Sequence, residues 1–594
     1  MTTETGQIGE LDPFDVRIAS SATGLLRKFN QADVLTAADV HLAHRLSELA
    51  GEPDEEVRLA LALTVRGVRG GSVCVDLREV SRIDPALDWP QLTRWVDKIR
   101  ASPLVGPGRP LRWDLDLLYL DRYWRQEDQV RADLVARESQ LPPPVDADLL
   151  GSSLDRLFGP HTDGAHTDGA HTDQRLAAEI AARRWTTVLG GGPGTGKTTT
   201  VARLLVVLHE QHGPGLRVAL AAPTGKAAVR LQEAVRHVVA TDFDVADQER
   251  LGAVNASTLH RLLGSRPGDG TRFRHDRDNR LPHDVVVVDE TSMLSLTLMA
   301  RLLEALRPDS RLVLVGDPDQ LASVEAGAVL ADLVAGLSAR PLSAQGVRPV
   351  VVLTHNWRFG SGIGDLAATV RAGDADGALA VLGRGEDALD LETSESQIRG
   401  DVVHAATAIR DAAKSGDARG ALQQLDRHRV LCAHRTGPFG VQTWSRKIER
   451  WLAEVPGDPR EGEWYVGRPL LMTVNDYALG LFNGDTGVVV RQPDGSARAV
   501  FARGDELVDF APSRLADVQT VHAMTVHRSQ GSQFERVTVV LPPADSPLAT
   551  REMLYTALTR AEQHVRLVGS ETELRASIER PAARASGLRR RLST

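Results

Sequence analysis

The sequence predicts an α/β protein with two parallel-sheet cores, and three observations support this fold class. Strand-like apolar runs recur between helical segments, as in RVALAAP, DVVVVDE and RLVLVGD. A second series, RVLCAH, RVTVVLPP and HVRLVG, follows near the carboxyl terminus. Buried strands that alternate with helices form parallel sheets covered on both faces. A single phosphate-binding loop, GGPGTGKT, lies in the first series, so the second core lacks its own.

Composition excludes several classes of protein. The chain has 594 residues, is 42% apolar and contains no apolar run long enough to cross a bilayer. Its start is acidic and lacks the apolar segment of a secretory signal, and two cysteines, Cys74 and Cys432, cannot form a disulfide framework. We therefore expect a soluble, multidomain cytoplasmic protein. The net charge of -9 predicts that any nucleic acid is held in a local groove.

Residues 1–150 are predicted to form a separate helical docking domain. Thr36 and Asp39 suit a capping box for a helix that ends at Gly51. The expected apolar stripe of this helix consists of Leu42, Ala43, Leu46, Leu49 and Ala50. No catalytic set of residues is visible in the region, which favours contact with a partner protein.

Residues 151–174 are predicted to form a flexible linker, because HTDGAHTDGAHTD, at 161–173, repeats a polar five-residue unit without apolar periodicity. Metal binding by His161, His166 and His171 is the alternative. Five-residue spacing does not align the three imidazoles on a helix, so a linker is favoured.

The stretch GGPGTGKT has the spacing of a phosphate-binding loop, Gly191-x4-Gly196-Lys197-Thr198. Its glycines let backbone N–H groups surround phosphate oxygens, its lysine reaches the β and γ phosphates, and its hydroxyl ligates Mg²⁺. A strand-like WTTVL precedes the loop and an amphipathic helix follows. The apolar face of that helix is predicted to contain Val201, Leu204, Leu205 and Leu208. Nucleotide binding is therefore expected, although it does not name a reaction.

Carboxylates follow two of the predicted strands. Asp289 and Glu290 come directly after four valines, at the sheet edge where open α/β folds bind ligands. Asp289 is suited to hold Mg²⁺ through water, and Glu290 to orient and deprotonate the attacking water. Asp317 and Gln320 end the next strand, where a simple turn explains the local sequence equally well.

Two cores would enclose a cleft, so a nucleotide on the first core can be contacted by arginines of the second. Such arginine fingers contribute about 10³ to 10⁵ in rate. The candidates are Arg358 in HNWRF and Arg560 in TALTRA. Either one alone could equally be a surface charge in a chain this rich in arginine.

The complete motif series resembles that of superfamily 1 helicases, and most closely the RecD family. The series runs DQRLA, GGPGTGKTTT, APTGKAA, STLHRLLG, VVVVDETSM, VGDPDQL, NWRFGSGIGDLA, VNDYALGLFNGDTGVV, AMTVHRSQGSQF and LYTALTRAEQ. The resemblance implies RecA-like cores at 175–355 and at 356–464 with 519–594. It also implies an SH3-like β-barrel insertion at 465–518 in the second core.

The resemblance implies an ATP- and Mg²⁺-dependent helicase that moves 5′ to 3′ on single-stranded DNA. It would act at double-strand ends with RecB and RecC in exodeoxyribonuclease V, for recombinational repair. Alternatives are a stand-alone superfamily 1 helicase, an RNA helicase, a P-loop NTPase not coupled to DNA such as a small-molecule kinase, and a scaffold without turnover. Every catalytic position is occupied, which disfavours the scaffold.

By position, the resemblance also implies site residues. Catalysis is assigned to Lys197, Glu290, Gln320, Arg358 and Arg560. ATP contacts are assigned to Gln174, which would bind adenine, to Gly191, Gly192, Pro193, Gly194, Thr195, Gly196, Lys197, Thr198 and Thr199, and to Gly531 and Arg560. Metal contacts are assigned to Thr198 and Asp289. DNA contacts are assigned to Thr224, Lys226, Thr258, His260, Thr525, His527 and Ser529.

The chain departs from the family pattern at two positions. Gln533 stands where glutamate is expected, which affects a ribose contact, and Trp357 stands where tyrosine is expected and keeps a packing role. A nuclease site of the PD-(D/E)xK type needs an acidic residue two positions before a lysine, and none of the six lysines has one. We therefore expect no nuclease activity from this chain.

Overall fold

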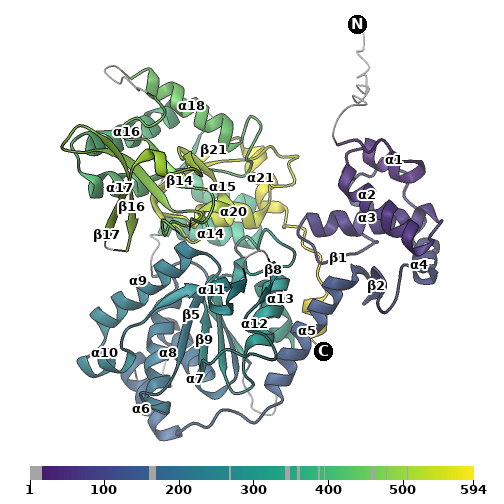
Figure 1. The fold of residues 1–594 in the computed structure, drawn as a ribbon, viewed down its shortest axis with the longest axis horizontal. Coiled ribbons are helices and arrows are strands. Elements are labelled where there is room, and N and C mark those ends of the chain that lie inside the picture. The colour runs from purple at the N-terminus through teal and green to yellow at the C-terminus, as the bar shows by residue number, and fades with distance from the viewer. Residues whose placement is uncertain are drawn as a thin grey trace.

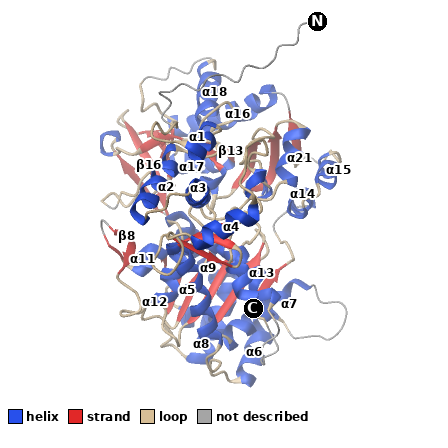
Figure 2. Ribbon diagram, turned by 90° about the vertical axis from the view of Figure 1, so that its right-hand side faces the viewer, coloured by secondary structure: helices blue, strands red, loops and turns tan. Residues whose placement is uncertain are grey.

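The computed structural model describes residues 17–159, 169–266, 269–340, 348–357, 361–385, 388–392, 395–455, 462–476, 478–504 and 506–593. Two α/β cores lie one above the other, and an N-terminal module stands to one side (Figure 1). Figure 2 shows the strands of both cores between layers of helices. The expected α/β class with two parallel sheets is confirmed. No helix in the described ranges is both long and apolar enough to span a membrane.

The N-terminal module packs four helices on a small antiparallel sheet. The elements are α1 Gly24–Gln31, α2 Ala37–Ala50, α3 Glu55–Arg69, β1 Cys74–Val75, α4 Leu92–Ala101, β2 Leu111–Asp114 and β3 Leu117–Leu120. The capping box of Thr36 and Asp39 at the start of α2 is confirmed. The predicted stripe is confirmed at Ala43, which is buried, and at Leu46 and Ala50, which pack against the core of the module. It is wrong at Leu42 and Leu49, which are 42% and 68% exposed. The buried face instead includes Asp39, which pairs with Arg69 of α3 at 2.8 Å and so turns this face inward.

The module has a hydrophobic cluster of its own and is also joined to the first core. Helix α5, Asp121–Glu138, follows the module and packs on α12, Leu296–Ala305, of the first core. The C-terminal helix α22, Leu588–Ser593, packs on both α5 and α13, Val329–Ala339. Cys74 and Tyr119 of the module therefore share one hydrophobic cluster with the first core.

The first core is a six-stranded parallel sheet in the order β11-β4-β10-β9-β5-β6. Its strands are β4 Thr186–Gly191, β5 Val218–Ala222, β6 Ala256–Thr258, β9 Val285–Val288, β10 Arg311–Gly316 and β11 Val350–Leu353. The remaining helices are α6 Ala147–Phe158, α7 Gly169–Arg183, α8 Lys197–His212, α9 Gly225–Asp242, α10 Val245–Leu251 and α11 Leu259–Leu263. Alternate strand residues are buried on opposite faces of the sheet, under α6 to α9 on one side and α11 to α13 on the other.

The segment predicted as a linker at 151–174 is helical at both ends. Residues up to Phe158 belong to α6, and those from Gly169 onward belong to α7. His161 and His166 lie outside the described residues, and His171 is in α7. On either side of the repeat, Leu154 of α6 and Ala177 of α7 are buried in the cluster that α8 shares.

The second core is a five-stranded parallel sheet in the order β12-β21-β20-β13-β19. Its strands are β12 Leu389–Glu392, β13 His428–Cys432, β19 Ala523–Thr525, β20 Phe534–Val540 and β21 Ala561–Val568. Its helices are α14 Ser361–Ala372, α15 Ala375–Leu382, α16 Glu395–Lys414, α17 Ala418–Arg427, α18 Val441–Ala453, α19 Val526–Ser529, α20 Arg551–Leu558 and α21 Glu571–Glu579.

An antiparallel sheet interrupts the second core between β13 and β19, where the insertion is predicted. Its order is β17-β16-β15-β14-β18, with β14 Pro469–Met472, β15 Thr486–Arg491, β16 Ala497–Arg503, β17 Glu506–Phe510 and β18 Val518–Thr520. No ladder joins the edge strands β17 and β18 in the described part of the sheet, so closure into an SH3-like barrel stays a prediction. A short hairpin, β7 Ser265–Arg266 with β8 Asp269–Phe273, projects from the first core.

Candidate functional site

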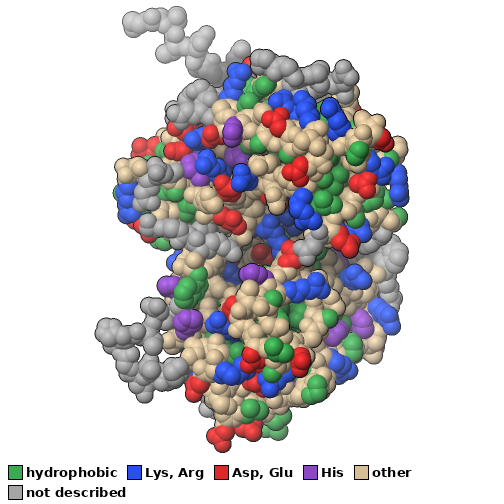
Figure 3. Space-filling view, turned by 90° about the vertical axis from the view of Figure 1, so that its left-hand side faces the viewer, with side chains coloured by type: hydrophobic (Ala, Val, Ile, Leu, Met, Phe, Trp, Pro, Cys, Tyr) green, Lys and Arg blue, Asp and Glu red, His purple; other side chains and the backbone are tan. Residues whose placement is uncertain are grey.

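A cavity of about 710 Å³ lies where the two cores meet. The molecular surface is hollowed between the cores, with basic side chains inside the hollow (Figure 3). Residues from both cores line the cavity, including Lys197 and Glu290 from the first core and Gly531 and Arg560 from the second. Sheet order explains this convergence, because β10 lies between β4 and β9. The carboxyl ends of these parallel strands therefore bring the phosphate-binding loop, Asp317 and Asp289 together.

The phosphate-binding loop connects β4 to α8 as predicted. Lys197 Nζ donates hydrogen bonds to the carbonyls of Gly191 and Gly192, at 2.7 and 2.8 Å. Gly196 has φ +84°, and a Cβ atom there would lie 2.4 Å from the Gln174 amide nitrogen. That amide is buried and donates to the Thr195 carbonyl at 3.5 Å. Glycine at 196 thus allows the predicted adenine residue to lie directly against the loop, beside Thr198 and Thr199 of the cavity wall.

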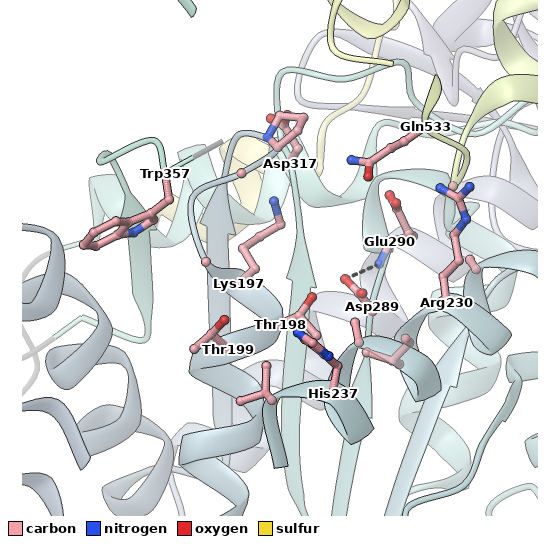
Figure 4. Close-up of a pocket in the computed structure, with 18 of the residues that line it drawn as sticks. Lys197, Thr198, Thr199, Arg230, His237, Asp289, Glu290, Asp317, Trp357 and Gln533 are labelled. Carbon is pink, nitrogen blue, oxygen red and sulfur yellow. Dashed lines mark hydrogen bonds between the residues drawn. The ribbon is translucent and has the colours of Figure 1, made fainter. Parts of the chain in front are cut away.

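Asp289 and Glu290 lie at the end of β9, opposite Lys197 (Figure 4). The backbone of Glu290 is left-handed, with φ +50°, and its N–H donates to Asp289 Oδ1 at 2.8 Å. Such backbone strain in a residue other than glycine is often found at functional sites. Burial and the neighbouring Glu290 raise the pKa of Asp289 to about 6. A half-buried carboxyl group of this kind, with Thr198 on the same cavity wall, suits a divalent cation.

A hydrogen-bond network joins the loop after β10 to the second core. Asp317 Oδ2 accepts from the Tyr555 hydroxyl at 3.0 Å and from the Gln320 amide at 3.1 Å. The Leu321 N–H donates to Thr556 Oγ1 at 2.8 Å, and its carbonyl accepts from Gln530 at 2.9 Å. Burial raises the pKa of Asp317 to about 6. Among the described residues, the Oε1 atom of Gln320 is buried and accepts no hydrogen bond, and Gln320 also lines the cavity.

Arg560 reaches the cavity from the segment after α20 and is almost fully buried. Its Nε donates to the Thr556 carbonyl at 3.1 Å and its Nη1 to the Ser532 carbonyl at 3.4 Å. Burial lowers the pKa of this guanidinium, while Glu290 and Asp317 act in the opposite direction. Gly531, with φ +71°, packs closely on α9, because a Cβ atom there would lie 3.4 Å from Ala227 Cβ.

Trp357 forms the opposite end of the cavity, next to Gln174. Its backbone N–H donates to the Gly194 carbonyl at 2.9 Å, and its ring centroid lies 5.5 Å from that of His171 and 4.4 Å from that of His355. The half-exposed indole is thus available as a stacking surface. Gln533 also lines the cavity. Arg358, the other predicted arginine finger, lies outside the described residues.

Sequence reasoning missed three contributors to the site. His171 was assigned to the linker, yet it lines the cavity. Tyr555 gave no local signal, because its role depends on how the cores dock. Arg230 also lines the cavity, and the available signal was its position four residues after Lys226, on the same face of a helix.

Three of the predicted DNA-contact residues share one structural position. Thr224, Thr258 and Thr525 follow or end β5, β6 and β19, and each caps the next helix by accepting a backbone hydrogen bond. The distances to the capped N–H groups are 3.2, 3.2 and 3.3 Å. Because β6 and β19 are edge strands of their sheets, two of these capped turns lie at the margins of the cores.

The other predicted DNA contacts differ in accessibility. His260 is exposed and lies 5.8 Å from Phe273 of the hairpin. Lys226 is half-buried, and burial lowers its pKa to about 8. His527 is half-buried, and burial lowers its pKa. Ser529 is fully buried and its hydroxyl donates to the Val526 carbonyl, so here it supports the turn and does not face a groove.

Comparisons with known proteins match most of the chain. Three family models match: an AAA domain over 174–326, a UvrD-like helicase C-terminal domain over 520–568, and the N-terminal domain of RecBCD enzyme subunit RecD over 31–119. RecBCD enzyme subunit RecD of Mycolicibacterium smegmatis is 55% identical over 94% of this chain and 98% of its own. The ATP-dependent RecD2 DNA helicase of Deinococcus radiodurans is 34% identical over 66% of this chain and 48% of its own.

A likeness to solved structures is more remote. The crystal structure of Bacteroides Pif1 bound to single-stranded DNA aligns with 69% of this chain and 94% of its own, at 17% identity and a TM-score of 0.37.

Proposed function

Because the chain belongs to the RecD family of superfamily 1 helicases, we propose that it is an ATP-dependent DNA helicase and one subunit of a RecBCD-type complex. The observation that carries this proposal is the cavity between the cores, where Lys197, Glu290 and Arg560 converge from both sides. A nucleotide bound there would change how the cores contact each other. Movement along DNA requires that kind of coupling.

In the proposed ATP site, Lys197 neutralises the β and γ phosphates, and Gln174 with Trp357 holds the adenine at the other end. Thr198 and Asp289 would hold Mg²⁺, which neutralises phosphate charge when bound. Glu290 orients the attacking water and accepts its proton. Gln320 and Arg560 then contact the terminal phosphate, which makes hydrolysis depend on closure of the two cores.

The proposed DNA path follows the capped turns at Thr224, Thr258 and Thr525. Their hydroxyl groups, with Lys226 and His260, suit contacts to phosphate and sugar, which hold a strand without reading its sequence. Thr224 caps helix α9, which forms part of the cavity wall further along, so both proposed sites share this helix. Direction of travel, 5′ to 3′, is proposed from family membership.

The proposed partners are RecB and RecC, with the N-terminal module as the docking domain. Support comes from the match of residues 31–119 to the N-terminal domain of RecD and from the exposed Leu42 and Leu49 on α2. The alternative of a stand-alone helicase is favoured by no feature of the structure. Co-expression with the RecB and RecC subunits of the same organism, followed by gel filtration, should yield one complex that contains all three chains.

The decisive experiment measures ATP hydrolysis by the full chain, with single-stranded DNA, RNA or no polynucleotide. DNA should stimulate turnover most strongly. Lys197→Ala and Glu290→Gln should each abolish turnover, whereas Lys28→Ala and Glu249→Gln, at exposed positions, should not change it. DNA-stimulated turnover at the wild-type rate in Glu290→Gln would refute the assigned base. Turnover that ignores DNA would instead favour a P-loop NTPase not coupled to DNA.

A further inference from the structure

Arg230 is a cavity residue for which neither the motif series nor the mechanism above has a role. It lies in the second turn of α9 and lines the cavity together with Lys197, Glu290 and Arg560. In Figure 4, its guanidinium lies at the end of the cavity that contains Glu290 and Gln533, away from Trp357, with Lys197 between the two ends. The residue therefore lies at the phosphate end of the proposed nucleotide site.

The charge of Arg230 has no fixed partner. Within the described ranges, no carboxylate forms an ion pair with its guanidinium, and no hydrogen bond of this group is formed. The side chain is half-buried, and this partial burial, with the nearby Arg560, lowers its pKa. A guanidinium that is partly removed from water gains from an accompanying anion. Asp426, Glu233 and Glu290 attract the guanidinium without forming an ion pair with it.

We propose that Arg230 binds the terminal phosphate of ATP, which makes it a third cationic ligand beside Lys197 and Arg560. This inference rests on the proposed function of the cavity. The guanidinium is a planar fork that matches two phosphate oxygens, and it remains charged in a buried site. We assign the contact to the terminal phosphate because Arg230 lies next to Glu290, and Glu290 must lie where water attacks that phosphate.

Helix α9 gives this contact a second consequence. Thr224 caps the start of the helix and Lys226 lies in its first turn, both at the proposed DNA path, and Arg230 follows one turn later. On the other side, Gly531 of the second core packs against Ala227 of the same helix. A phosphate held by Arg230 therefore fixes the helix that both the DNA and the second core contact. Loss of the terminal phosphate would release it.

The test compares triphosphate and diphosphate binding in the full chain. Arg230→Ala is measured beside Arg230→Lys, which keeps a charge, and beside the control Arg236→Ala, an exposed arginine of the same helix. The probes are fluorescent ADP and a fluorescent non-hydrolysable ATP analogue. We expect Arg230→Ala to weaken the binding of the ATP analogue tenfold or more and to change the affinity for ADP less than twofold. The kcat for DNA-stimulated ATP hydrolysis should fall at least tenfold. The lysine variant should recover part of each loss.

Equal weakening of both nucleotides would overturn the proposal, because it would indicate a structural role for Arg230. Triphosphate affinity like that of Arg236→Ala would overturn it as well. Failure of the proposed function is a different result. It would appear as wild-type ATP hydrolysis that single-stranded DNA does not stimulate, whatever the Arg230 variants do.

Discussion

The hydrogen bond from Tyr555 to Asp317 offers a direct test of coupling between the cores. The Tyr555 hydroxyl of α20 donates to Asp317 Oδ2 of the first core at 3.0 Å, in a fully buried setting. Tyr555→Phe removes this donor and keeps the ring, which is 4% exposed. Asp317 then retains the Gln320 amide and the Asp319 N–H as donors. The change thus isolates one bond that joins the cores.

The expected effect follows from the charge on the acceptor. A hydrogen bond to a charged group contributes about 1.5 to 3 kcal/mol. Since about 1.4 kcal/mol corresponds to a tenfold change, closure of the cores should become about 10 to 150 times less favourable. If closure is part of each turnover, kcat for DNA-stimulated ATP hydrolysis should fall at least tenfold at saturating ATP and DNA. The affinity for ADP should change little, because Tyr555 does not line the main cavity.

The pKa of Asp317 determines how stability and kcat should change with pH. Burial raises the pKa of Asp317 to about 6, and the Tyr555 hydrogen bond opposes that rise, so Tyr555→Phe should raise this pKa further. The folded protein then binds the proton more tightly than the unfolded chain does. The contribution of Asp317 to stability is therefore full below pH 3.8 and is lost as pH rises toward about 6. The acid limb of the kcat profile should move to higher pH in the variant.

The matched control is Tyr465→Phe, whose hydroxyl lies 3.4 Å from His522 and stays within the second core. This variant should keep kcat within twofold of the wild type. If Tyr555→Phe also keeps kcat within twofold and leaves the acid limb in place, the hydrogen bond does not contribute to turnover. The inference that this network couples the cores would then be wrong.

Three further predictions concern separate parts of the protein. Gln174→Ala should reduce the preference for ATP over GTP about tenfold in kcat/KM, because adenine loses its amide partner; an unchanged ratio would exclude adenine contact. Glu127→Gln should lower the free energy of unfolding by about 3 to 5 kcal/mol, measured with urea, because it breaks a buried ion pair with Arg591. Thr258→Ala should remove about 1 kcal/mol of helix-capping stability. It should also weaken the binding of single-stranded DNA, measured by fluorescence anisotropy, and an unchanged affinity would show that Thr258 does not contact the DNA.

Sequence patterns correctly predicted those parts of the site that are formed by a single strand and the loop that follows it. Val201 and Leu205 of α8 are buried as expected, since this helix follows a loop whose spacing fixes its start. Asp289 could likewise be placed at a sheet edge from four preceding valines. The prediction for α2 failed at Leu42 and Leu49, because Asp39, held by Arg69, helps to decide which face turns inward. A prediction made from hydrophobic residues alone does not take that polar contact into account.

Contacts between the cores could not be predicted from sequence patterns. Gln530 and Thr556 bond to Leu321 across more than 200 residues of chain, with sequence separations of 209 and 235. Neither residue type is unusual locally, and only the docking of two sheets brings them together. Arg560 was found because its motif is distinctive. Arg230 was not found, because an arginine on an amphipathic helix is ordinarily a surface charge.

The position of the C-terminal tail bears on how far movement of the cores can spread. The tail leaves the second core after α21 and runs past the N-terminal module to α22 beside α5 (Figure 1). Buried Glu127 of α5 accepts hydrogen bonds from Ser586 and Gly587 of the tail, each at 2.9 Å, and pairs with Arg591. One end of the tail is thus held by the second core and the other end by α5, which packs on the first core. The nucleotide is proposed to bring these two cores together. Because the module and α5 pack on the first core, movement of the second core must be taken up by residues 580–585, which join α21 to the anchored tail.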